Sequence, residues 1–337
     1  MVLGTRDAVG AWEQQLGRLR RRRTTAGRHR PLRAFLPTTC PGTTFGFGER
    51  SGQPRVWRVP IKSNVLQFLR EAVGDRFTVD REIARGGAAR VFRAVDADGR
   101  TVALKVLHPQ LAVTVSGARF LREIRFLERL DHPHIAKFLH SGETDLLIYY
   151  VMTYIDGPTL REHIKTDRRL SVSNTRTIAR DLLDALGYAH GEGIVHRDVK
   201  PENIVLSRSG PVLVDFGIAR AAAEAATDKL TRSGIAVGTS SYMSPEQVEG
   251  DIDIDHRTDL YSLGCVLFEC LTGRPPFTAG REEDIRKMHV ELEAPDVRTL
   301  RKDTPEEMAH LIAKALATVR DDRWPTARAM REMVIDG

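Results

Sequence analysis

Cysteine is scarce in this chain, and long apolar runs are missing. Its three cysteines, Cys40, Cys265 and Cys270, form neither a C-x-x-C pair nor a metal-binding spacing, which argues against a disulfide framework. No uninterrupted apolar run reaches about 18 residues, so no transmembrane span is predicted. The start of the chain lacks the basic-then-apolar order of a secretory signal. Together these absences predict a reducing, cytoplasmic location.

Acidic residues are scarce in the leading segment, where residues 1–75 hold 14 Lys and Arg against 5 Asp and Glu. The remainder holds 37 basic against 40 acidic residues, so the excess positive charge belongs to the leading segment. An arginine-rich run from Arg18 to Arg33 could make weak contacts with nucleic acid or an anionic surface. A solvated tail is the simpler interpretation. We predict a disordered segment over residues 1–62 and a short lead-in helix over residues 63–75.

One stretch places a carboxylate, an ammonium and an amide at fixed offsets, namely Asp198, Lys200 and Asn203 within His196–Asn203. Apolar residues flank it, as expected for a loop between short strands. The order His-Arg-Asp-x-x-x-x-Asn is that of a protein-kinase catalytic loop. A charged surface turn after an amphipathic helix is the alternative. Matching motifs elsewhere in the chain, in the expected order, favour the catalytic loop.

With this motif the chain resembles the eukaryotic-like protein kinases, and more closely their bacterial serine/threonine branch, from about Phe77 to about Met333. The resemblance implies an α+β kinase domain over residues 76–335. Its small lobe, residues 76–154, would hold an antiparallel sheet and helix C, and its large lobe, residues 155–335, would be mainly α-helical. It also implies that Asp198 and Lys200 act on the substrate hydroxyl and the transferring phosphoryl group, and that Asn203 binds magnesium.

A second motif, Asp215-Phe216-Gly217, follows an apolar strand. In the kinase family, which this chain resembles, such a triplet supplies a magnesium ligand, here Asp215, and an aromatic residue that packs between the lobes, here Phe216. The resemblance therefore implies ATP and Mg²⁺ as cofactors, with Mn²⁺ as a substitute.

The segment Glu82–Val91 matches the glycine-rich nucleotide loop of this family only in part. Its three glycine positions hold Ala84, Gly86 and Ala89. A methyl group makes backbone conformations with positive φ costly, so the two alanines weaken the prediction of tight ATP binding. They are the one feature that favours a pseudokinase.

Lys105 interrupts an apolar strand over residues 101–107, and a lysine there costs free energy unless it is paired. The resemblance implies that it holds the α- and β-phosphates and pairs with Glu123, on a helix predicted over residues 120–130. The nucleotide contacts implied by the resemblance are Ile83, Gly86, Val91, Ala103, Lys105, Met152, Thr153, Ile155 and Val205.

The residues from 218 to 246 resemble an activation segment. Thr231 and Ser233 are the candidate phosphorylation sites, and Arg197 would pair with such a phosphate. Unmodified hydroxyls are the alternative. Asp259 is expected to hold the backbone of the catalytic loop, and Arg323 to pair with Glu246. The resemblance gives structural roles to His196, Arg197, Phe216, Gly217, Thr239, Glu246, Asp259 and Arg323.

These expectations combine into an ATP-dependent protein serine/threonine kinase that acts on protein substrates, including its own activation segment. Autophosphorylation between two copies would involve a homodimer. The alternatives are a pseudokinase scaffold, a kinase tethered through the arginine run, and a small-molecule phosphotransferase. The match at Gly238–Glu246 argues against the last, because in the family that region shapes a peptide-binding surface.

Overall fold

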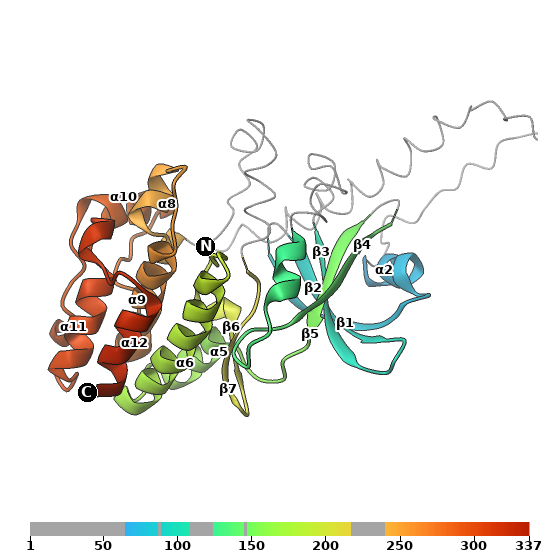
Figure 1. Ribbon diagram of the computed structural model, residues 1–337, viewed down its shortest axis with the longest axis horizontal. Helices are drawn as coiled ribbons and strands as arrows, with labels where there is room; N and C mark the ends of the chain where they lie inside the picture. The colour runs from blue at the N-terminus through green and yellow to red at the C-terminus, as the bar shows by residue number, and fades with distance from the viewer. Residues whose placement is uncertain (1–64, 87–88, 108–123, 145–146, 217–239, 337) are drawn as a thin grey trace, which may run out of the picture.

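The computed structural model describes residues 65–86, 89–107, 124–144, 147–216 and 240–336. They form a small lobe built on a β-sheet and a larger, mainly helical lobe (Figure 1). The predicted fold class is thereby confirmed. Across these described ranges, no helix combines the length and the apolar character that crossing a membrane requires.

The small lobe is a five-stranded antiparallel sheet in the order β1-β2-β3-β5-β4. Its strands are rich in β-branched and aromatic residues, which suit a pleated, half-buried surface. In the central strand β3, the register places Lys105 opposite Val91 of β2 and opposite Tyr150 of β5. The strands are β1 (Phe77–Arg85), β2 (Ala89–Asp96), β3 (Thr101–Leu107), β4 (Phe138–Glu143) and β5 (Ile148–Thr153).

Helix α2 (Val65–Val73) packs against one face of this sheet, and it is the helix expected between residues 63 and 75. Leu69 and Val73 are buried in an apolar cluster that also contains residues of β1, β2, β3 and β5. Arg70 donates from Nε to the carbonyl of Val79 at 2.8 Å and from Nη2 to that of Asp80 at 2.9 Å. The small lobe therefore includes helix α2 in addition to the sheet.

We expect Leu69→Ala to lower the free energy of unfolding by about 2 kcal/mol, because a deleted buried leucine leaves a cavity. Leu69 is only 1% exposed. Urea denaturation followed by circular dichroism measures the change. Leu292→Ala, at a side chain that is 49% exposed, is the matched control and should shift stability by less than about 0.5 kcal/mol. Equal stabilities for the two variants would show that α2 adds nothing to the small lobe.

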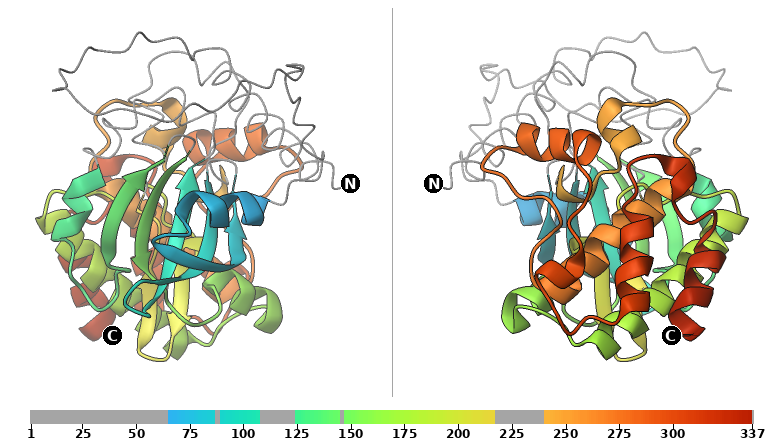
Figure 2. Two further views of the ribbon diagram at one scale, coloured as in Figure 1. Left: turned by 90° about the vertical axis from the view of Figure 1, so that its right-hand side faces the viewer. Right: turned by 90° about the vertical axis from the view of Figure 1, so that its left-hand side faces the viewer.

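The large lobe is organised around helix α9, in which every residue from Thr258 to Leu271 is buried. It packs against α6 and α11, and the right-hand view of Figure 2 faces the helical lobe. Gly264 allows α9 to pack closely against α11, since a Cβ there would lie 2.9 Å from Cβ of Ala315 in α11. The helices are α5 (Leu160–Asp167), α6 (Val172–Gly191), α8 (Pro245–Glu249), α9 (Arg257–Thr272), α10 (Glu282–Glu291), α11 (Glu306–Ala315) and α12 (Ala327–Asp336).

Short elements complete the large lobe and join it to the sheet. Strands β6 (Ile204–Ser207) and β7 (Gly210–Leu213) form a hairpin next to α6. The helix predicted over residues 120–130 appears in its described part as the 3₁₀ helix η1, with Ile124 and Leu127 buried as the apolar stripe predicts. The 3₁₀ helices are η1 (Ile124–Arg129), η2 (Pro201–Asn203), η3 (Ser240–Tyr242), η4 (Val297–Thr299) and η5 (Arg320–Asp322).

A buried histidine in α10 makes stability depend on pH. Nδ1 of His289 lies 2.8 Å from the hydroxyl of Tyr261, and burial lowers the pKa of His289 from 6.5 to about 4. As pH falls below 6.5, the unfolded chain takes up the proton first, so the free energy of unfolding decreases until about pH 4. We expect this histidine to account for about 3 kcal/mol of that decrease.

Urea denaturation of the parent chain and of His289→Gln at neutral and at mildly acidic pH measures this contribution. The parent should lose more stability than the variant on acidification, because glutamine does not titrate. Equal losses of stability in the parent and in His289→Gln would show that His289 does not cause the pH dependence.

Candidate active site

The predicted catalytic loop lies between α6 and β6 and is held by Asp259, the fully buried acid in the first turn of α9. Asp259 accepts the backbone N–H of His196 at 2.8 Å and that of Arg197 at 2.7 Å. Its Oδ2 also lies 2.8 Å from Nε2 of His190. Burial raises the pKa of Asp259, but the contacts with His190 and His196 outweigh it and keep the pKa below its usual value.

These bonds stabilise an unusual backbone. Arg197 has a φ of 62°, which a side-chain-bearing residue adopts only at a cost in free energy. Two charge-assisted hydrogen bonds from its own and the preceding N–H offset that cost. The conformation places the side chain of Asp198, next in the chain, in contact with Lys200 and Asn203.

Three polar groups of the loop meet at Asp198. Nζ of Lys200 lies 2.9 Å from Oδ1 and 2.7 Å from Oδ2 of the carboxylate. Asn203 donates from Nδ2 to the Asp198 carbonyl at 2.9 Å and to Oδ2 at 3.0 Å. The side chain of Asp198 is 39% exposed, so the carboxylate remains accessible to an incoming hydroxyl. The amide nitrogen of Asn203 faces Asp198, which leaves its oxygen for a metal.

Lys105 from the small lobe contacts Asp215 from the large lobe, with 2.8 Å between Nζ and Oδ1. Burial lowers the pKa of Lys105, but the charge of Asp215 outweighs burial and raises it above the usual value. Asp215 has a φ of 63°, so the backbone just after β7 is also strained. Glu123, the partner predicted for Lys105, lies outside the described residues. The contact of Lys105 with Asp215 was not predicted.

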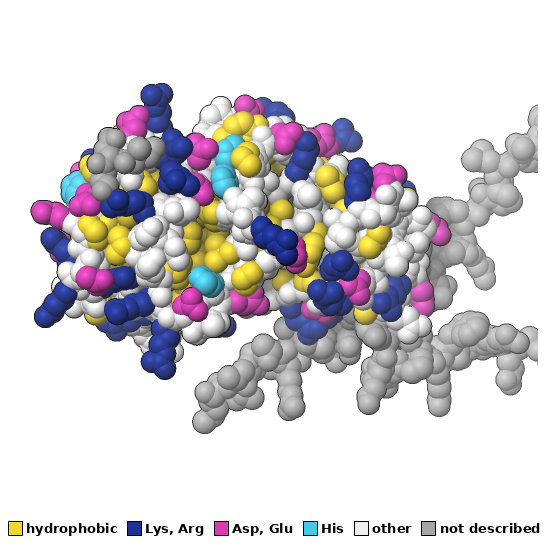
Figure 3. Space-filling model, turned by 90° about the horizontal axis from the view of Figure 1, so that it is seen from below, with side chains coloured by type: hydrophobic (Ala, Val, Ile, Leu, Met, Phe, Trp, Pro, Cys, Tyr) yellow, Lys and Arg dark blue, Asp and Glu magenta, His cyan; other side chains and the backbone are white. Residues whose placement is uncertain are grey.

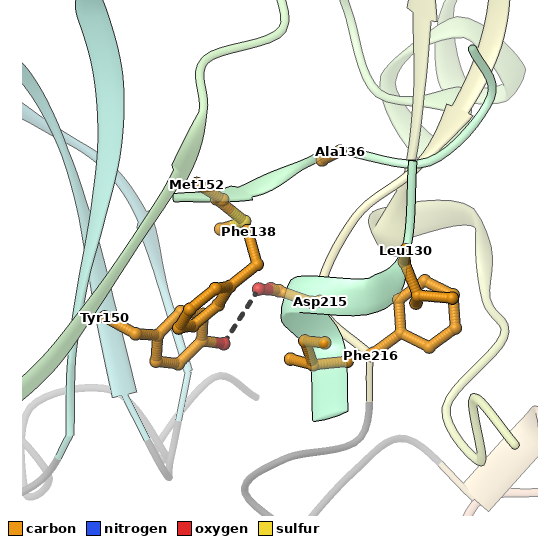
Figure 4. A pocket seen from close by; sticks show the side chains of 8 residues that line it. Leu130, Ala136, Phe138, Tyr150, Met152, Asp215 and Phe216 are labelled. Atoms are coloured by element: carbon orange, nitrogen blue, oxygen red, sulfur yellow. Dashed lines mark hydrogen bonds between the residues drawn. The ribbon is translucent and has the colours of Figure 1, made fainter. Parts of the chain in front are cut away.

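A small cavity lies beside this ion pair, between the lobes (Figure 4). Phe216 enters it from the large lobe, and its ring centroid is 4.4 Å from that of His196. Tyr150 and Met152 enter from β5. The lining residues are Leu127, Leu130, Ala136, Phe138, Tyr150, Met152, Asp215 and Phe216.

The predicted nucleotide contacts are spread over both lobes. Val91 and Ala103 are buried on neighbouring strands, and Ala103 pairs with Met152 of β5. The N–H of Thr153 donates to the carbonyl of Lys137 at 2.9 Å, so an adenine contact from Thr153 would use its carbonyl. Ile155 lies just beyond the end of β5, Val205 lies in β6, and Ile83 is 39% exposed on β1.

The alanines in the predicted nucleotide loop lie in ordinary backbone conformations. Ala84 belongs to β1 and Ala89 to β2, and neither is among the described residues with positive φ. The N–H of Gly86 donates to the carbonyl of Ala89 at 2.9 Å, which closes the hairpin. The methyl groups at residues 84 and 89 therefore cause no backbone strain in this hairpin.

Arg323 and Glu246 form a buried ion pair between helix α8 and the turn before α12. The arginine side chain is 0% exposed, and its Nη1 and Nη2 each lie 2.8 Å from a carboxylate oxygen. It also donates to the carbonyls of Ala317 at 2.7 Å and Thr318 at 2.9 Å. Burial raises the pKa of Glu246, but Arg323 outweighs burial, and the pKa lies below its usual value.

Several predicted residues fall outside the described part of the chain, and sequence reasoning missed two residues within it. Tyr150 contacts Asp215 and Lys105, and His190 contacts Asp259. The alignment of β5 with β3 could have indicated Tyr150, since it lies directly across from Lys105. The predicted residues outside the described ranges are Glu123, Gly217, Thr231, Ser233, Thr239 and the run Arg18–Arg33.

Comparison with known proteins agrees with this geometry. The model of the protein kinase domain family matches residues 77–335. The chain is 40% identical over 274 residues to the probable serine/threonine-protein kinase PknB of Bifidobacterium longum, covering 78% of this chain and 39% of that protein. It is 38% identical over 266 residues to the serine/threonine-protein kinase PknB of Mycobacterium tuberculosis, covering 77% and 42%.

Among solved structures, the chain resembles the crystal structure of Rad53 1-466 in complex with AMP-PNP. The TM-score is 0.63 at 25% sequence identity, over 77% of this chain and 65% of that chain. The chain therefore belongs to the protein kinase domain family. It spans about two fifths of the length of the two curated relatives.

Proposed function

We propose that this chain is a protein serine/threonine kinase that transfers the γ-phosphoryl group of ATP to serine and threonine hydroxyls of proteins. The observation that carries the proposal is the arrangement at Asp198, where Lys200 and Asn203 contact an accessible carboxylate on a loop fixed by Asp259. The relatives named above as serine/threonine-protein kinases support the choice of hydroxyl acceptor.

Each group at this site has a role in the proposed reaction. Asp198 orients the acceptor hydroxyl and takes its proton as the oxygen attacks phosphorus. Lys200, within 2.9 Å of both oxygens of that carboxylate, is placed to neutralise charge on the transferring phosphoryl group. Lys105 exchanges its contact with Asp215 for the α- and β-phosphates. Rate acceleration would come from positioning and from charge stabilisation.

The donor set fits a divalent cation held jointly with nucleotide phosphates. The amide oxygen of Asn203 and the carboxylate of Asp215 are oxygen ligands of the type that Mg²⁺ prefers, and Mn²⁺ accepts the same donors. Within the described ranges, no three His, Cys, Asp or Glu side chains gather into a metal site, so phosphate oxygens would complete the coordination. A bound metal would neutralise charge on the phosphates.

Incubation with Mg²⁺, γ-labelled ATP and a general acceptor protein such as casein tests the proposal. Labelled phosphoserine or phosphothreonine in the acceptor is the expected result. Nucleotide binding without transfer to any acceptor would instead support the pseudokinase scaffold. A small-molecule phosphotransferase would label small hydroxyl compounds and leave proteins unlabelled.

The proposal extends to regulation and partners. We propose autophosphorylation at Thr231 or Ser233 between two copies of the chain, with Arg197 as partner of the phosphate, in a kinase that works in the cytoplasm. Free, buried Cys265 and Cys270 fit a reducing compartment. On the face in Figure 3, Lys and Arg are interspersed with Asp and Glu, so the run Arg18–Arg33 is the proposed source of any anion binding. Binding to anionic vesicles that weakens with salt would support it.

A further inference from the structure

Tyr150 is a buried phenol whose polar end faces the ion pair of the site. The residue is 2% exposed, and its strand β5 pairs with β3 so that Tyr150 lies across from Lys105. Its ring stacks near Phe138, with centroids 6.4 Å apart. A phenylalanine would satisfy that packing equally well, so packing alone does not explain the hydroxyl.

The hydroxyl has specific partners in both lobes. It donates to Oδ1 of Asp215 over 3.4 Å, the dashed contact in Figure 4, and it also interacts with the ammonium of Lys105. Lys105 Nζ lies 2.8 Å from the same Oδ1. Both donors thus converge on one carboxylate oxygen. No hydrogen bond or ion pair from the described residues reaches Oδ2, which can therefore accept a cation.

The need for a second donor arises when the nucleotide enters. In the proposed reaction Lys105 turns to the phosphates, and Asp215 loses its ion pair at Oδ1. The other side chains that line the described cavity there are apolar: Leu127, Leu130, Ala136, Phe138, Met152 and Phe216. An isolated carboxylate beside apolar groups would be costly and free to rotate. Tyr150 supplies a donor that stays in place, because its ring is buried.

We propose that Tyr150 is a positioning residue, whose hydroxyl holds Oδ1 of Asp215 so that Oδ2 is presented to the metal that accompanies the nucleotide. This role rests on the proposed kinase function. Groups that hydrogen-bond to metal ligands commonly affect metal affinity strongly, although they do not touch the metal. Tyr150 would act in the same way, from the small lobe onto a ligand of the large lobe.

Calorimetric titration of ADP into the parent and into Tyr150→Phe, in Mg²⁺ and in EDTA, tests the role. We expect the Mg²⁺-dependent gain in ADP affinity to fall about tenfold in the variant. Affinity in EDTA should change less than about twofold, because the lost hydrogen bond acts through the metal ligand. In phosphotransfer, the Mg²⁺ concentration for half-maximal rate should rise, and high Mg²⁺ should restore the rate.

Tyr149→Phe is the matched control. Tyr149 is adjacent in β5 but lies in the apolar cluster that contains Leu69, with its hydroxyl 3.1 Å from Arg76. It should keep the full Mg²⁺-dependent gain. An equal Mg²⁺-dependent gain in ADP affinity in Tyr150→Phe and in the parent would overturn the positioning role of Tyr150. A parent that binds ADP no more tightly in Mg²⁺ than in EDTA would also overturn it. If Tyr150→Phe does not fold, Tyr150→Met is measured in its place. A parent that shows the gain but transfers no phosphate would overturn the kinase proposal alone.

Discussion

Asp198→Asn is expected to lower the rate of phosphoryl transfer by about 10²- to 10⁴-fold, the usual contribution of a general base. Asparagine preserves the size of the side chain but does not accept the proton of the acceptor hydroxyl. It also removes the charge that attracts Lys200, now 2.7 Å from Oδ2. Initial rates of transfer from γ-labelled ATP measure the effect, and calorimetry checks that the variant still binds ATP.

The control for this variant is Asp98→Asn, which removes a carboxylate in the turn between β2 and β3 whose side chain is 70% exposed. It should transfer phosphate at the parent rate. A rate for Asp198→Asn within about twofold of the parent would show that this carboxylate takes no proton in the rate-determining step.

Arg323→Ala is expected to lower the free energy of unfolding by about 3–5 kcal/mol. The substitution leaves the carboxylate of Glu246, which is 5% exposed, buried and without its counter-charge. It also removes the donors to the carbonyls of Ala317 and Thr318. Urea denaturation followed by circular dichroism measures the loss.

Two comparisons separate this explanation from a simple loss of packing. Arg328→Ala removes an arginine that is 88% exposed and pairs with Glu332 at 3.0 Å, and it should cost at most about 0.5 kcal/mol. Adding Glu246→Gln to Arg323→Ala should recover part of the stability, because the unpaired charge disappears. No recovery in the double variant would assign the loss to packing alone.

The framework of the fold could be predicted because short-range patterns and one ordered set of motifs specify it. The apolar run over residues 101–107, which Lys105 interrupts, predicts a strand, and it forms β3. The loop at Asp198 could also be predicted, because its polar groups lie within six residues of one another. Their contacts depend on local backbone geometry, which the sequence motif determines.

Contacts between the lobes could not be predicted in the same way. Lys105 and Asp215 are 110 positions apart, and Tyr150 reaches Asp215 only because of the pairing of β3 with β5. A sequence identifies Lys105 as a residue that needs a carboxylate, but several carboxylates qualify. The choice among them depends on how the two lobes are placed and on whether a nucleotide competes for the lysine.

The most direct test of the kinase proposal is mass spectrometry of residues 215–246 after incubation of the purified chain with Mg²⁺ and ATP, beside Asp198→Asn. We expect phosphate on Thr231 or Ser233 in the parent and none in the variant. This result would demonstrate turnover that depends on Asp198. A parent chain that binds ATP but carries no phosphate, and phosphorylates no added protein, would contradict the account and favour the scaffold.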